Sequence, residues 1–151
     1  MKVCFFLGGF YQNGGIGRVT SVLANGLAES GKIKVVTLGY FNPGKPNIYQ
    51  LSKNIQQEFL LEKYKSMTTV MLLNGEKKLR VFLEDNDIDV LVACGALFFP
   101  IAVRACKTIA TKYSSDRDTL RVECKSAVFH ADFLLLRLSR FGNSTGSDAS
   151  S

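Results

Sequence analysis

The chain has 151 residues, of which 46% are hydrophobic and 21% are charged, and this balance excludes a wholly disordered polypeptide and suits one domain of ordinary size. Its net charge of +6 favours anionic partners such as phosphates, nucleotides or membrane head groups, but no dense run of lysine and arginine with interleaved aromatic residues predicts a nucleic-acid partner. Four cysteines without a CxxC pair and a single histidine argue against a zinc site, and cysteines in apolar runs suit a reduced, cytoplasmic protein.

The first forty residues contain the pattern of a strand, a helix and a second strand. Residues 2–7 form a continuous apolar run, which is typical of a strand buried on both faces of a parallel sheet. A glycine-containing loop at residues 10–17 follows, and apolar side chains then recur at helical spacing and predict a helix that ends near Gly31. Residues 33–38 are rich in β-branched side chains, so the segment predicts a right-handed βαβ unit. The periodic residues of the helix are Ile16, Val19, Val22, Leu23 and Leu27.

The remainder of the chain predicts further strands and helices. In chain order these are a turn at residues 42–46, a short strand at 47–51, a helix over 55–73, a helix at 76–84, a strand at 88–93, a helix at 97–112 and a strand at 120–129. The order predicts an α/β fold, with a Rossmann-like, open, doubly wound and mainly parallel sheet and helices on both faces. We expect one domain over residues 1–140 and a disordered, Gly- and Ser-rich tail at 141–151.

The loop that opens the first helix carries the strongest functional signal. Gly14, Gly15 and Gly17 lie where the helix begins, and Arg18 follows them in the first turn. Glycines allow the backbone to approach a ligand and to adopt positive φ, and a helix N-terminus offers free N–H groups and the positive end of the dipole. These features predict a site for a diphosphate, with Arg18 adding a charge-assisted contact. The alternative is that the glycines serve only tight packing against the sheet.

Two common phosphate motifs fail when they are tested against this loop. The dinucleotide fingerprint GxGxxG, counted from Gly15, requires Gly or Ala where Thr20 stands, and no acidic residue follows the second predicted strand. The P-loop requires Ser or Thr after Gly-Lys, but Ile33 and Pro46 follow the two Gly-Lys pairs. A nucleotide-dependent oxidoreductase is therefore disfavoured.

The same stretch resembles the start of glycosyltransferase family 4. The resemblance rests on the apolar strand at residues 2–7, the sequence Gly-Gly-Ile-Gly-Arg-Val at 14–19, the helix sequence Leu-Ala-Asn-Gly-Leu-Ala at 23–28, and Gly31 before a valine-rich strand. It covers most of residues 1–130. These enzymes have the GT-B fold, in which two Rossmann-like domains face a cleft, so the resemblance implies the N-terminal, acceptor-side domain of such an enzyme.

The resemblance implies the chemistry and the site. The glycine loop, here Gly14, Gly15 and Gly17 with Arg18, would reach the diphosphate of a nucleotide-diphosphate sugar, and His130 would lie beside the sugar being transferred. His130 also has the alternative of being an ordinary surface or part-buried histidine. The reaction would move a sugar onto an acceptor hydroxyl in polysaccharide or glycolipid biosynthesis. The donor is a substrate, and neither a cofactor nor a metal is implied.

The family's donor-binding second domain has no counterpart in this sequence. We therefore expect a truncated enzyme, a fragment or one half of a two-chain enzyme, with the apolar residues 133–138 left exposed. A non-catalytic partner subunit, or a remnant domain that docks a separate donor-binding chain, is the main alternative. The positive charge suits a lipid-linked acceptor and peripheral contact with a membrane, whereas no run of about 18 apolar residues predicts a membrane-spanning helix.

Overall fold

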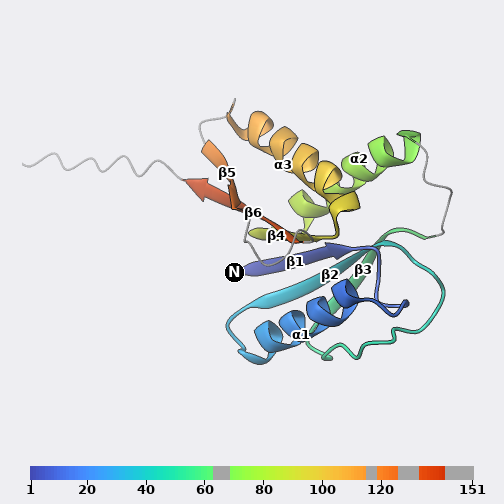
Figure 1. Cartoon of the computed structure of the whole chain (residues 1–151). Coiled ribbons are helices and arrows are strands. Elements are labelled where there is room, and N and C mark those ends of the chain that lie inside the picture. Colours follow the sequence, from blue (N-terminus) through green and yellow to red (C-terminus); the bar gives the residue numbers. More distant parts are fainter. Residues whose placement is uncertain (63–68, 115–118, 126–132, 142–151) are drawn as a thin grey trace, which may run out of the picture.

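A single mixed sheet organises the computed structural model, which describes residues 1–62, 69–114, 119–125 and 133–141. The sheet has six strands in the order β3-β2-β1-β4-β6-β5 (Figure 1). The strands are β1 (Lys2–Leu7), β2 (Lys34–Phe41), β3 (Gln56–Leu61), β4 (Val90–Cys94), β5 (Thr119–Lys125) and β6 (Phe133–Phe141). β1 to β4 are parallel, and β6 is antiparallel to both of its neighbours, so the predicted α/β class with a mainly parallel sheet is confirmed.

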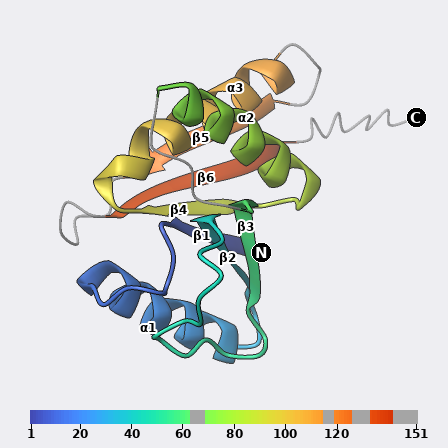
Figure 2. The same cartoon turned by 90° about the vertical axis from the view of Figure 1, so that its right-hand side faces the viewer.

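Helices cover both faces of this sheet. α1 (Gly15–Glu29) lies against one face, and α2 (Thr69–Asp85) and α3 (Phe99–Ser114) lie against the other (Figures 1 and 2). A short 3-10 turn, η1 (Ala96–Phe98), leads from β4 into α3, and Pro100 occupies the first turn of α3, where its missing N–H is tolerated.

The two faces explain why the first strand is apolar throughout. Alternate side chains of β1 point to opposite faces, so Cys4 and Phe6 enter the core beneath α2 and α3, while Val3, Phe5 and Leu7 enter the core beneath α1. All five are buried. A strand at the sheet centre needs apolar residues at every position, as the sequence predicted.

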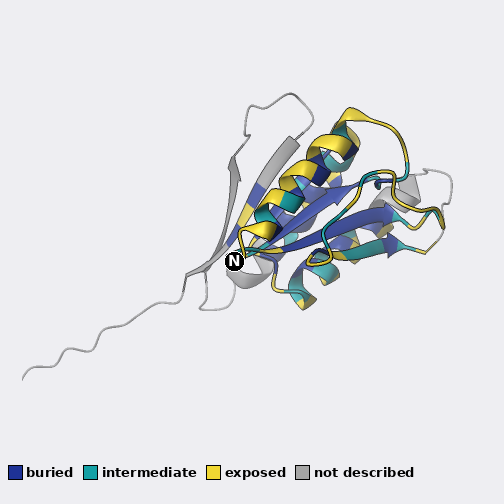
Figure 3. Ribbon diagram, turned by 90° about the horizontal axis from the view of Figure 1, so that it is seen from below, coloured by how far each residue is buried: buried dark blue, intermediate teal, exposed yellow. Residues whose placement is uncertain are grey.

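The helix α1 ends where the sequence predicted, but its faces are arranged differently. Gly31 has φ of 66°, a left-handed conformation that favours glycine just after a helix. The buried side of α1 consists of small residues, whereas Val19, Val22 and Leu23 are exposed (Figure 3). The sheet fills the intervening space with large side chains such as Phe5, so the fully buried residues of α1 are small, while Ile16 and Leu27 pack at the edge of this core. The residues on that buried side are Gly17, Thr20, Ser21, Ala24 and Ala28.

The sequence prediction was wrong for residues 47–51 and for the first part of the helix predicted over 55–73. Residues 47–51 form no strand, and β3 (Gln56–Leu61) stands where that helix was predicted to begin. Residues 69–73 are helical as predicted and belong to α2, whereas residues 63–68 lie outside the described residues. β3 pairs in parallel with β2, from Val36 opposite Gln56 to Phe41 opposite Leu61. The residues of this segment carry little strand preference of their own, and the pairing with β2 stabilises the segment as an edge strand.

The expected exposed segment at residues 133–138 is also corrected. β6 (Phe133–Phe141) inserts between β4 and β5, and Leu136 and Leu138 are buried against the α2 and α3 face. The core between the sheet and helices α2 and α3 therefore buries these two apolar side chains, without a partner domain. β6 runs one residue past the predicted domain limit at 140, and the tail at residues 142–151 lies outside the described residues.

The cysteines Cys4, Cys94 and Cys106 are free and buried. Burial raises the pKa of the Cys94 thiol to about 12 and raises that of Cys4 as well, because a thiolate loses its hydration in the core. A raised pKa keeps the thiol protonated and unreactive throughout neutral and mildly alkaline pH.

We expect iodoacetamide at pH 8 to leave Cys4 and Cys94 unmodified in the folded chain and to modify both in urea, as peptide mass mapping would show. Rapid modification of the folded chain would contradict this burial.

Within the described part of the chain, no helix is both long enough and apolar enough to cross a membrane.

Candidate functional site

The candidate site lies at the carboxyl ends of β1 and β4, which are adjacent in the sheet. From the carboxyl end of β1 the chain passes through α1 on one face to β2, whereas from the carboxyl end of β4 it passes through η1 into α3 on the other face. The connections therefore diverge at this point (Figures 1 and 2). In open α/β sheets such a divergence leaves a crevice where ligands commonly bind. Gly9 follows β1 with φ of 140° and Gly95 follows β4 with φ of 100°, so both strands turn through backbone conformations that favour glycine.

The N-terminus of α1 stands over this edge. A Cβ built on Gly95 would lie 3.5 Å from Cδ1 of Ile16, which places the first turn of α1 next to the end of β4. Gly14 is the N-cap and offers no side-chain cap, and the first helical bond runs from the N–H of Arg18 to the Gly14 oxygen at 3.2 Å. Among the described residues, no acceptor is bonded to the N–H groups of Gly15, Ile16 and Gly17. These three donors are therefore available to an anion.

The three glycines of the loop have different surroundings. A Cβ on Gly14 or Gly15 would meet nothing within 4 Å, so nothing in the described structure requires glycine there for packing. A Cβ on Gly17 would lie 3.1 Å from Cε2 of Tyr49, so the packing alternative holds for this residue. None of the three has positive φ, and Gly14 is extended at −173°, which corrects the expectation that the loop uses left-handed backbone.

Tyr49 closes the loop from a segment far along the chain. Its hydroxyl accepts a hydrogen bond from the N–H of Gly14 at 3.1 Å and donates one to the Gly14 carbonyl oxygen at 3.2 Å. The side-chain amide of Asn25 donates to the Gln50 oxygen at 3.0 Å, and the N–H of Ser52 donates to Asn25 at 2.8 Å. Sequence reasoning missed Tyr49, because a tyrosine in an irregular segment carries no pattern that links it to a helix 35 residues earlier.

The remaining predicted site residues are Arg18 and His130. Arg18 is exposed in the first turn of α1, and its carbonyl oxygen accepts a hydrogen bond from the Ser21 hydroxyl at 2.8 Å. The structure brings Arg18 together with Gly14, Gly15 and Gly17 on one helical turn, as predicted. His130 lies outside the described residues.

A hollow of about 730 Å³ opens at the same edge of the sheet, beyond β2 and β3. The rings of Tyr11 and Phe41 meet edge to face there, with centroids 5.5 Å apart. Lys45 and Glu62 add a cation and a carboxylate. Aromatic surface beside groups that donate and accept hydrogen bonds suits a ligand with apolar faces and hydroxyl edges, such as a sugar ring. The hollow is lined by Tyr11, Gln12, Phe41, Asn42, Pro43, Gly44, Lys45 and Glu62.

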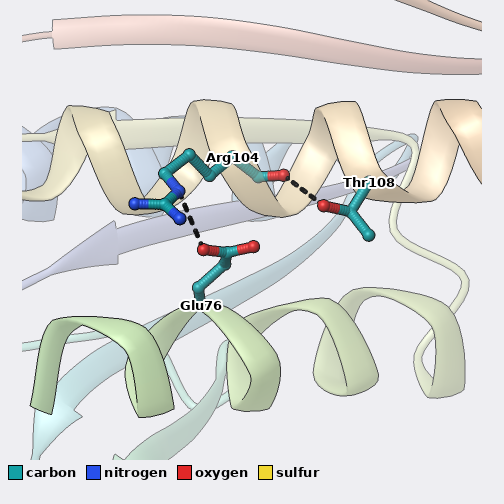
Figure 4. A network of polar contacts seen from close by, with 3 residues as sticks. All are labelled: Glu76, Arg104 and Thr108. Carbon is teal, nitrogen blue, oxygen red and sulfur yellow. Dashed lines mark hydrogen bonds and ion pairs between the residues drawn. The ribbon is translucent and has the colours of Figure 1, made fainter. Parts of the chain in front are cut away.

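A second hollow, of about 430 Å³, lies where α2 and α3 meet beyond β4. It is mostly apolar, with Leu97, Pro100 and Ile101 in its wall. At its margin, Nε of Arg104 lies 3.0 Å from Glu76, and the Thr108 hydroxyl donates to the Arg104 carbonyl oxygen (Figure 4). Arg104 is 62% exposed, so solvent screens this ion pair and it contributes little to stability.

No protein-family model matches the chain, and no characterised protein matches its sequence. The function of the chain is therefore inferred from its residues and their geometry.

Proposed function

We propose that this chain is the acceptor-side domain of a sugar transferase with the GT-B arrangement, as its resemblance to glycosyltransferase family 4 implies. The sheet would then be the open, doubly wound sheet of a Rossmann-like domain. The observation that carries the proposal is the N-terminus of α1, where Gly14 and Gly15 leave open space beside unbonded N–H groups at the crevice between β1 and β4.

In this proposal the glycine loop binds the diphosphate of a nucleotide sugar. When the bond between the sugar and the diphosphate breaks, negative charge grows on the leaving group. The N–H groups of Gly15, Ile16 and Gly17, together with the helix dipole, would stabilise that charge, and Arg18 would add a positive charge nearby. No metal is needed for this step. His130 is proposed to act beside the transferring sugar, as the family resemblance implies.

The hollow lined by Tyr11 and Phe41 is the proposed place for the acceptor. The hydroxyl groups of the acceptor would form hydrogen bonds with Lys45 and Glu62, and the faces of its sugar ring would pack on the aromatic side chains. The hollow and the α1 N-terminus belong to the same edge of the sheet, so an acceptor and a diphosphate bound to this domain would face the same side.

Titration of the isotopically labelled full chain, followed by amide NMR, tests the proposal. We expect pyrophosphate and UDP- or GDP-sugars to shift the amide signals of Gly15, Ile16 and Gly17, with Kd on the order of 1 mM, since a few hydrogen bonds provide the contact. Tight binding of NAD(P) with no response to diphosphate sugars would instead indicate a nucleotide-dependent oxidoreductase. Diphosphate binding by a chain that transfers sugar only when a second chain is added would indicate the partner-subunit alternative.

A further inference from the structure

The outward face of α1 is apolar and uncovered in the described structure. Val19, Val22 and Leu23 are 45%, 65% and 48% exposed, and Figure 3 shows the exposed residues running along the helix. Positions three and four apart lie on one side of a helix, so the three side chains form a continuous patch, here called the α1 patch. The sheet-facing side of α1 is already filled, so rotation of the helix would not bury the patch without exposing that side.

Two opposite charges lie at the two ends of the α1 patch. Arg18 precedes it and Glu29 follows it, and both are exposed. Eleven residues separate them, which is about three full turns and about 16 Å along the axis, so both charges lie on the same flank of the helix. Within the described residues, neither side chain forms an ion pair.

We propose that the α1 patch is the interface of a homodimer in which two copies of α1 pack antiparallel about a two-fold axis near Leu23. The two-fold rotation reverses the helix and keeps the flank, so Arg18 of each copy meets Glu29 of the other. Leu23 contacts its own counterpart, and Val19 and Val22 pack around it. A parallel arrangement would place the charges of the two copies on opposite flanks, with Arg18 level with Arg18, so no Arg18–Glu29 pair would form. The face is therefore complementary to itself in one orientation, which is the property of an isologous interface.

The size of the α1 patch determines how strong this dimer is. A standard interface buries about 800 Å² on each partner, and the face of a single helix of 15 residues provides less. We therefore expect a weak dimer, populated at high protein concentration and weakened by salt because of its two exposed ion pairs.

Charge reversal tests the proposal by sedimentation equilibrium of the full chain from micromolar to near-millimolar concentration. We expect the wild type to dimerise, and Glu29→Arg or Arg18→Glu alone to raise the dimer Kd about tenfold. The double variant, with the two charges exchanged, should return the Kd close to that of the wild type. Asp85→Arg makes the same charge change as Glu29→Arg but on α2, and it should leave the dimer Kd unaltered. A wild type that stays monomeric, or a double variant no better than the single ones, would overturn the proposal.

A cysteine at the expected axis gives a second measurement. Cys4, Cys94 and Cys106 are buried, so Leu23→Cys in a Cys124→Ser background introduces an accessible thiol at a defined place. An added two-electron thiol oxidant should join two copies by a disulfide between the introduced sulfur atoms, which the axis brings together. Far less product is expected when the cysteine replaces Lys77 on α2 in the same background. Equal yields at both positions would contradict the interface. Arg18 is also placed beside the diphosphate in the proposed function, so the dimer is measured without diphosphate. Failure of the dimer would leave the proposed function standing, because the N–H groups of the loop take no part in the interface.

Discussion

Replacing Gly15 with leucine is expected to abolish diphosphate binding while leaving the chain folded. A Cβ at this position meets nothing within 4 Å, so the substitution creates no clash in the described structure. Leucine also favours a helix over glycine by about 0.5–1 kcal/mol, so the unfolding free energy should not fall. Side chains of a helix tilt toward its N-terminus, and a leucine at the first helical position would therefore lean over the unbonded N–H groups of the next residues. The measurement is the NMR titration with pyrophosphate, with urea unfolding beside it.

Gly26 provides the matched control for this experiment. It lies in the same helix and is equally open, with nothing within 4 Å of an added Cβ, but it stands near the other end of α1. Gly26→Leu should therefore match Gly15→Leu in stability and keep the wild-type affinity for pyrophosphate. If Gly15→Leu binds pyrophosphate as the wild type does, the N-terminus of α1 is not the anion site, and the main structural support for the proposed function is removed.

Phe6→Ala should cost about 3–5 kcal/mol of unfolding free energy, the largest effect expected of a single substitution in this chain. Phe6 is fully buried on the central strand β1, beneath α2 and α3. Its ring packs against Phe98 and Tyr40, with centroids 5.2 Å and 6.2 Å away. Truncation removes the contacts of the ring with β2 and η1 and leaves a cavity. Because β1 is hydrogen-bonded to a strand on each side, it cannot move to close this cavity. Urea denaturation of both proteins measures the difference.

Phe82 is a matched control for Phe6. It is a phenylalanine on α2 that packs against the same core from a partly exposed position. Phe82→Ala should lose less than half as much stability as Phe6→Ala, because part of its ring is already in contact with water and the site can fill with solvent. Equal losses for the two variants would mean that β1 is not the centre of the core.

The elements predicted correctly from the sequence are those whose patterns depend on residues close together in the chain. β1 and β4 are continuous apolar runs, and α1 ends at Glu29, two residues before Gly31, whose left-handed backbone is typical of a helix terminus. β3 was missed because its residues begin with Gln56 and Gln57, which carry little strand preference, and its pairing with β2 is a contact across the sheet. Apolar periodicity likewise predicted α1, but it marked the buried face only in part. Ile16 and Leu27 pack against the core, whereas Val19, Val22 and Leu23 are exposed.

The candidate site was predicted in part. Gly14, Gly15, Gly17 and Arg18 could be found from their position after a strand and at the start of a helix. The sequence could not predict that Gly17 packs on the ring of Tyr49 while Gly14 and Gly15 stay open, because the tyrosine comes from a segment with no regular structure.

The amino-acid sequence by itself determined the α/β class, the buried central strand and the glycine-rich start of α1, because apolar runs, helical spacing and glycine position act through neighbours along the chain. The tertiary structure decided which side of α1 faces the sheet, that β6 enters between β4 and β5, and that Tyr49 closes the glycine loop. Each of these depends on the shape and hydrogen-bonding groups of residues distant in sequence. Beneath α1 the large side chains of the sheet fill the core, so the small residues of α1 lie closest to the sheet and the α1 patch faces outward.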